Sequence, residues 1–119
     1  VCHAGTTFTN NSFQYIGVRP TSEDTGRFQV TGNTGDLGQF RVPTLRNVEL
    51  RSPFFHNGRM QTLEDVVAFY NRGGDANRES KSALIIPLNL SKSEINAVVA
   101  FLETLTSADE PQTLPILPR

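Results

Sequence analysis

The chain has 119 residues, with 11 lysines and arginines against 12 aspartates and glutamates. This length is typical of one domain, and the near-zero net charge argues against binding driven by bulk attraction to nucleic acid. No apolar run approaches the roughly 18 residues that a membrane-spanning helix needs, and the single cysteine excludes an internal disulfide or a cysteine-rich zinc site. Only 37% of the residues are hydrophobic. Either the domain is loosely packed, or a group that the sequence does not encode fills its centre.

Residues 17–42 combine five glycines and one proline with few apolar side chains, which predicts mostly loop. Short strands are predicted at residues 27–31 and 39–42. Pro43 suits the first turn of a short helix over residues 44–50, because its missing N–H has no helical partner there in any case. We therefore expect long connections between few regular elements in this part of the chain.

A clear helix is predicted over residues 62–71. Thr62 and Asp65 form a capping box, in which each side chain bonds the backbone N–H of the other residue. Gly73-Gly74 then supplies a stop. The apolar face of this helix contains Leu63, Val66, Val67 and Tyr70.

The last helix begins at a second capping box, formed by Ser91 and Glu94, and is expected to end near Thr106. The residues that follow include three prolines and cannot be helical throughout. We therefore divide the chain into a domain at 1–106 and a Pro-rich C-terminal tail at 107–119. The apolar stripe of this helix contains Ile95, Val98, Val99, Leu102 and Leu105.

Cys2 and His3 are the residues that point most directly to chemistry. A c-type haem is attached through the pattern C-x-x-C-H, in which two thiols form thioethers and the histidine binds iron. Val1, Cys2 and His3 match the last three positions, so the first cysteine of such a pattern lies upstream of Val1, outside this chain. The competing interpretation is a small buried cysteine beside an incidental histidine.

Three residues are candidates for a second iron ligand opposite His3. Met60 is the only methionine, and a thioether is a common axial ligand, although methionine also fills gaps in cores. Tyr70 has its ring on the apolar face of the predicted helix, where a core aromatic with a bonded hydroxyl is the alternative. His56 is equally consistent with a buried histidine bonded to the backbone.

Several motifs follow Cys2-His3 in a fixed order. Cys2-His3 and these motifs together resemble the C-terminal haem domain of the bacterial di-haem cytochrome c peroxidase family, which includes the MauG-like enzymes. The resemblance extends to about Thr106. The motifs are DTGR at 24–27, FRVPTLRNV at 40–48, SPFFHNG at 52–58 and TLEDVV at 62–67.

The resemblance implies an all-α c-type cytochrome domain, with few helices and long loops around a covalently attached haem c. It also implies a periplasmic oxidoreductase that reduces hydrogen peroxide to water or uses it to oxidise another protein. In the family, an N-terminal domain carries the peroxidatic haem and the C-terminal domain carries a six-coordinate haem that relays electrons. The catalytic residues are then expected outside this chain, which alone is not expected to be catalytically competent.

The partners that the resemblance implies are the N-terminal peroxidatic haem domain, hydrogen peroxide, and an electron-donor protein or an oxidised protein substrate. Nucleic acid and a membrane span are not expected among them. A homodimer is compatible with the resemblance, although the sequence does not fix the oligomeric state.

The resemblance makes Cys2 the thioether residue and His3 the proximal iron ligand. The distal methionine of the family follows the histidine of the Pro-Phe-Phe-His motif by fourteen residues, and the MauG-like members have tyrosine there. Fourteen residues after His56 is Tyr70, whereas Met60 follows by only four. Tyr70 is therefore the expected distal ligand, with Met60 as the alternative.

The resemblance also places His56 in the haem surroundings. Arg46 is a second residue for these surroundings, because a planar guanidinium suits a haem propionate. A calcium ion at the domain interface of the family takes backbone carbonyls from the segment just before the motif histidine. In this chain those carbonyls belong to Arg51 and Pro53.

Two other functions remain open. A monohaem c-type cytochrome that only transfers electrons has the same fold, the same His3 ligand and the same last helix. A haem-free helical interaction module makes Cys2-His3 incidental. An absorption spectrum distinguishes the haem-free interaction module from any haem protein.

Overall fold

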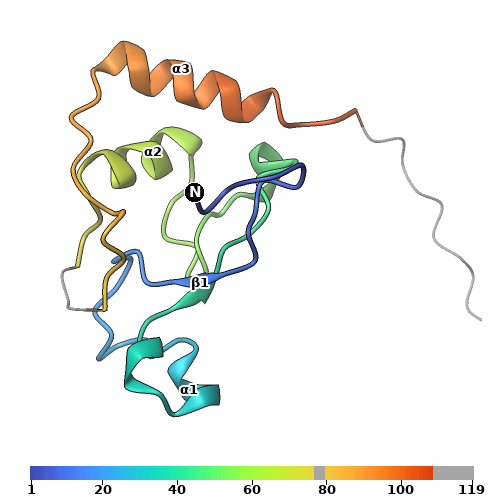
Figure 1. The fold of residues 1–119 in the computed structure, drawn as a ribbon. Coiled ribbons are helices and arrows are strands. Elements are labelled where there is room, and N and C mark those ends of the chain that lie inside the picture. The colour runs from blue at the N-terminus through green and yellow to red at the C-terminus, as the bar shows by residue number, and fades with distance from the viewer. Residues whose placement is uncertain (77–79, 109–119) are drawn as a thin grey trace, which may run out of the picture.

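A computed structural model describes residues 1–76 and 80–108 of the chain. Its regular structure is mainly helical, and long connections join the elements (Figure 1). Helix α3 crosses one end of the molecule above α2, while β1 and α1 lie further from it. In chain order the elements are β1 (Phe13–Gln14), α1 (Phe28–Thr31), the 3-10 helix η1 (Thr34–Asp36), β2 (Phe40–Arg41), the 3-10 helix η2 (Val48–Arg51), α2 (Leu63–Asn71) and α3 (Lys92–Glu103).

A two-stranded sheet corrects the expected all-α class. β1 and β2 pair antiparallel, with Phe13 opposite Arg41, so the strand predicted at 39–42 is confirmed. The strand predicted at 27–31 is wrong, because these residues form the short helix α1. Gly32 closes that turn by donating to the Phe28 carbonyl at 2.9 Å, with a φ of 66° that favours glycine.

The helix predicted over residues 44–50 forms only in its last part, as η2. At its start, the Thr44 hydroxyl accepts a hydrogen bond from the Arg46 backbone N–H at 3.1 Å. Such local side-chain bonds compete with helical hydrogen bonding. The residues before η2 contact the start of the chain instead.

Helix α2 confirms both signals that predicted it. Thr62 and Asp65 form the reciprocal capping box. At the other end, the Gly73 N–H donates to the Tyr70 carbonyl and the Gly74 N–H to the Phe69 carbonyl, both at 3.0 Å. These bonds satisfy carbonyls that the last turn leaves free. A Cβ on Gly73 would lie 2.9 Å from Pro87, so this stop needs glycine for space as well as for its φ of 81°.

Helix α3 also has its predicted capping box, between Ser91 and Glu94. It ends at Glu103, earlier than the predicted Thr106. The cause is Thr104, whose N–H is shared between the carbonyls of Ala100 and Phe101 and whose hydroxyl donates to Phe101 at 2.6 Å. These bonds tighten the last turn and stop propagation.

The core lies between α2 and α3. The apolar stripe predicted for the last helix is confirmed at Val99 and Leu102, which are buried, but it is wrong at Val98, which is 37% exposed. The buried cluster consists of Phe54, Leu63, Val67, Val99 and Leu102, with Leu45, Val48, Met60, Val66, Ile95 and Leu105 packed against it.

Two other expectations concern a membrane-spanning helix and the C-terminal tail, and the structure describes only part of the chain for each. No helix in the described part of the chain is both long and apolar enough to span a bilayer. Most of the tail predicted at 107–119 lies outside the described residues, so its boundary stays a prediction.

Asp75 ties the end of α2 to an early loop. Its carboxylate accepts a hydrogen bond from Arg72 Nε at 2.5 Å and lies 3.4 Å from an Arg59 nitrogen. Its backbone N–H donates to the Gly17 carbonyl at 3.0 Å. The bond from Arg72 holds the pKa of Asp75 below its usual value, and the charges of Arg72 and Arg59 add to this effect.

Removing this charge should lower stability in a pH-dependent way. A carboxyl whose pKa is lower in the folded state stabilises above its unfolded-state pKa, and that contribution is lost as the pH falls through the folded-state value. Asp75→Asn should therefore reduce the free energy of unfolding by about 1 kcal/mol near neutral pH and make no difference in strong acid. Denaturant titrations across the acid range measure this, and a constant difference at every pH would contradict it.

Candidate functional site

The His3 side chain is oriented by a backbone carbonyl. Its Nδ1 lies 3.0 Å from the carbonyl oxygen of Phe8. Because a carbonyl only accepts, Nδ1 must carry the proton, and the neutral ring keeps its lone pair on Nε2. A metal-binding histidine has this arrangement, with one nitrogen donating to an acceptor and the other available as a ligand.

The chain closes a loop around this histidine. The Cys2 carbonyl accepts from the Asn10 N–H at 2.9 Å, and the Phe8 N–H donates to the Gly5 carbonyl at 3.1 Å. Cys2 and His3 are both partly exposed. The residues predicted from C-x-x-C-H are therefore accessible and held in a defined conformation.

Tyr70 lies near the C-terminal end of α2 and is half-buried. Its ring packs edge-on against Phe69, with centroids 5.2 Å apart, and lies 6.3 Å from the ring of Phe55. Burial, and secondly the charge that the Cys2 thiolate would carry, raise the pKa of Tyr70 to about 12. The fold thus brings the Tyr70 hydroxyl within electrostatic reach of Cys2, and only a cation at its oxygen would favour the phenolate near neutral pH.

Exposed apolar side chains border this region. Val98 and Phe101 are 37% and 51% exposed and lie three residues apart, on one face of α3. The Phe101 ring meets the Phe8 ring edge-on at 6.5 Å, so this face lies beside the loop that holds His3. Further exposed apolar residues are Leu84, Ile86 and Leu88.

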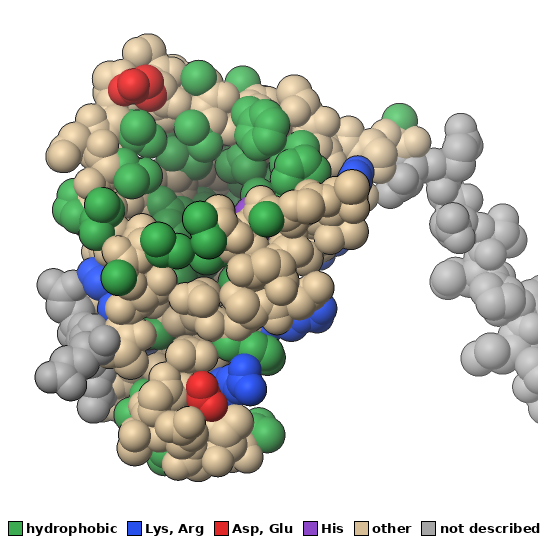
Figure 2. Space-filling model, viewed as in Figure 1, with side chains coloured by type: hydrophobic (Ala, Val, Ile, Leu, Met, Phe, Trp, Pro, Cys, Tyr) green, Lys and Arg blue, Asp and Glu red, His purple; other side chains and the backbone are tan. Residues whose placement is uncertain are grey.

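Figure 2 shows hydrophobic side chains gathered around a hollow on the face that carries α2 and α3. A hollow with apolar walls, an available imidazole nitrogen, a thiol and a phenol nearby suits a haem, whose ring is apolar and whose iron takes such ligands. The residues present therefore fit a haem, and Cys2 fits one of the two thioethers of c-type attachment. The chain supplies one thiol.

Met60, the alternative ligand, is used in packing. Its side chain lies against the core cluster, and its backbone carbonyl accepts from the Phe54 N–H at 2.7 Å. Its surroundings are those of a gap-filling methionine. This placement favours Tyr70 as the candidate ligand.

His56 forms a pair that the sequence did not predict. Its Nε2 lies 2.8 Å from the Asp24 carboxylate, and its ring stacks on Phe40 with centroids 3.6 Å apart. The signal for Asp24 was available, because it belongs to the DTGR motif, but nothing in that motif names its partner.

Arg46 contacts the start of the chain. Its Nε and Nη2 both donate to the Thr6 carbonyl, at 2.9 and 2.6 Å. The sequence did not predict this contact, because every residue has a backbone carbonyl and residue type does not show which one will accept a hydrogen bond.

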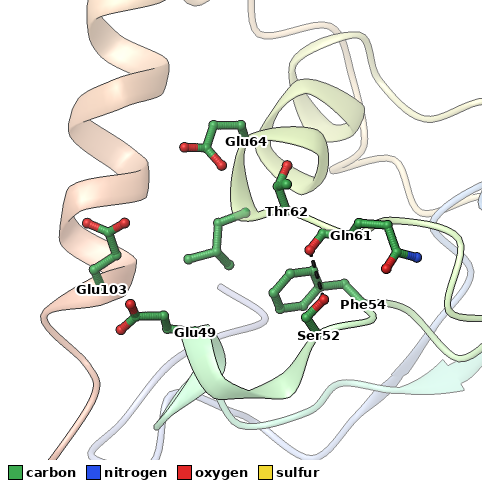
Figure 3. Close-up of a pocket in the computed structure, with 8 residues that line it drawn as sticks. Glu49, Ser52, Phe54, Gln61, Thr62, Glu64 and Glu103 are labelled. Atoms are coloured by element: carbon green, nitrogen blue, oxygen red, sulfur yellow. Dashed lines mark hydrogen bonds between the residues drawn. The ribbon is translucent and has the colours of Figure 1, made fainter.

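Arg51 and Pro53, the residues of the calcium prediction, flank Ser52 at the end of η2. The nearby pocket has a volume of about 170 Å³. The Ser52 hydroxyl donates across one side of it to the Gln61 carbonyl at 2.8 Å, and Glu49 and Glu103 also line it (Figure 3). Within residues 1–76 and 80–108, no three histidine, cysteine or acidic side chains are grouped to hold a metal ion. The calcium site therefore stays a prediction that rests on carbonyls.

Known proteins match this chain clearly. No protein-family model does, but the chain is 41% identical to the cytochrome c551 peroxidase of Nitrosomonas europaea and 36% identical to the methylamine utilization protein MauG of Methylorubrum extorquens. Each alignment covers 98% of this chain and 33% of the relative, so the chain spans about a third of their length.

A solved structure agrees with these relatives. It is that of a MauG-like protein associated with microbial copper homeostasis, which is 30% identical to this chain. The match has a TM-score of 0.80 and covers 88% of this chain and 41% of the other.

Neighbouring positions on α3 separate the core from the exposed face of the helix. Val99 is 5% exposed, so Val99→Asp buries an unpaired charge and should cost several kcal/mol. Val98→Asp leaves its charge near solvent and should cost much less. Chemical denaturation of the two variants, matched in residue type and charge, measures the difference. An equal loss of stability would place Val98 in the core.

Proposed function

Because the chain is homologous over most of its length to di-haem cytochrome c peroxidases and MauG, we propose that it is the haem c-binding, electron-relay domain of a periplasmic di-haem peroxidase. The observation that carries this proposal is the His3 ring, whose Nδ1 is bonded to the Phe8 carbonyl while Nε2 is left as a ligand beside Cys2. The parent enzyme reduces hydrogen peroxide or uses it to oxidise another protein.

Cys2 and His3 hold the cofactor in this proposal. A bound haem c supplies one-electron redox chemistry. Cys2 Sγ would form one thioether, and a second thioether would need a thiol that this chain does not supply. His3 Nε2 would bind the iron. The hydrogen bond from Nδ1 to the Phe8 carbonyl increases electron donation from the ring, which is the usual effect of such a partner on a ligating imidazole.

Tyr70 would supply the second iron ligand. Burial raises the pKa of this phenol, and a bound ferric ion would offset that effect and favour the phenolate. A phenolate is a hard donor and favours ferric iron more than a thioether does. Tyr70 therefore places the domain nearer the MauG-like branch than the peroxidases with methionine at this position.

The roles of the two domains follow from this ligation. If His3 and Tyr70 both held the iron, this domain would leave no open site for peroxide. The peroxide reaction then belongs to an N-terminal haem domain, and this domain exchanges electrons with a donor protein or an oxidised protein substrate. His56 stays in the haem surroundings through its ring, since its Nε2 is bonded to Asp24.

The distal ligand can be tested by a pair of substitutions. Tyr70→Phe keeps the ring and removes the oxygen donor, so the ferric spectrum should change from low spin toward five-coordinate or water-ligated iron. Met60→Leu should leave the spectrum unchanged, because Met60 packs in the core. Electron paramagnetic resonance and optical spectra of the haem-loaded protein measure both. The reverse pattern would overturn the assignment and favour a His/Met cytochrome.

A further inference from the structure

The segment at residues 42–46 is bonded along its length to the loop that carries His3. Four hydrogen bonds join two parts of the chain that are 33 to 40 positions apart. We call this segment the 42–46 clamp. Its bonds run from Thr9 Oγ1 to the Val42 carbonyl (2.7 Å), from Thr44 Oγ1 to the Thr7 carbonyl (2.5 Å), and from Arg46 Nε and Nη2 to the Thr6 carbonyl (2.9 and 2.6 Å).

Arg46 contributes two of these bonds through one rigid group. Both nitrogens reach a single carbonyl, that of Thr6, and the guanidinium carbon lies 5.8 Å from the centre of the Phe8 ring. A planar guanidinium fixes position in this way better than a flexible ammonium does. The partner is a neutral carbonyl, so this role differs from the propionate pairing that the sequence suggested.

Phe8 is the residue on which these contacts converge. Its φ is 50°, in the left-handed region that is uncommon for bulky residues and needs support from the surrounding structure. Its ring is held between Arg46 and Phe101. Its carbonyl accepts the bond from His3 Nδ1. Movement of the Thr6 or Thr7 carbonyl would therefore move the acceptor that orients the imidazole.

We infer that Arg46, together with Thr44, is a positioning residue for His3: the clamp holds the Phe8 carbonyl against Nδ1 and so sets the orientation and donor strength of the imidazole. This inference rests on the proposed function, in which His3 Nε2 binds iron. A firm Nδ1 hydrogen bond makes the imidazole a stronger donor and stabilises ferric over ferrous iron. The clamp therefore lowers the reduction potential of the domain.

Two conservative substitutions test the clamp without removing a charge. Arg46→Lys keeps the cation and loses the planar fork, and Thr44→Val keeps the shape and loses the hydroxyl bond to Thr7. Arg46 is exposed, so its substitution leaves the core intact. Arg41→Lys is the matched control, because Arg41 bonds the Asn11 side chain outside the clamp. Thr44→Ser should restore the wild-type values.

The measurements are the reduction potential of the haem-loaded protein and the exchange rate of the His3 Nδ1 proton by paramagnetic NMR. Arg46→Lys and Thr44→Val should each raise the reduction potential. Each should also speed exchange of the His3 Nδ1 proton by about tenfold, the equivalent of one weakened hydrogen bond. Arg41→Lys should change neither. If Arg46 instead acts as a cation on a propionate, Arg46→Lys and Thr44→Val both stay at the wild-type potential.

The failures of the two ideas can be told apart. A Soret band that stays unchanged when His3 is substituted would overturn the proposed function and the clamp together. Wild-type protein with a His3-ligated haem, in which both variants keep the wild-type potential and proton exchange rate, would overturn the clamp alone.

Discussion

The hydrogen bond between His3 Nδ1 and the Phe8 carbonyl is the contact on which the site depends. At 3.0 Å it fixes the tautomer of the ring and directs Nε2 away from the backbone. Phe8 can offer this carbonyl only because the loop closes on itself through Gly5 and adopts a left-handed φ. The short N-terminal loop therefore orients the His3 imidazole through its Nδ1.

The packing of the domain is divided in the same way. The buried cluster between α2 and α3 is small, while Val98 and Phe101 on the other face of α3 remain exposed. Large exposed apolar surfaces usually mark a binding site. Under the proposed function, this explains the low apolar content of the sequence: the protein builds one side of a core, and the other side is the surface that a haem would cover.

Local rules allowed the helices to be predicted. The capping boxes at Thr62 and Ser91 and the glycine stop at Gly73 involve residues close in sequence, and the structure has all of them. The predictions failed where distant contacts decide. Periodicity could not separate Val98 from Val99, because the two lie on adjoining faces and only tertiary packing leaves one exposed.

The site was predictable only in part, for a related reason. Cys2-His3 and Tyr70 carry their chemistry in their residue types, so the sequence could nominate them. Arg46 offered a cation, which suggested an anionic partner, whereas the fold presents the carbonyl of Thr6 from 40 residues away. Backbone acceptors have no residue signature, so the bonds that orient His3 could not be read from the sequence.

Mass spectrometry of the tryptic peptide that ends at Arg27 tests the central claim, that Cys2 and His3 hold a haem, most directly. The protein should be produced with the c-type haem-attachment machinery, and this peptide contains the only cysteine of the chain. The account predicts a peptide heavier by one covalently bound haem. An unmodified Cys2 in haem-replete material would contradict it.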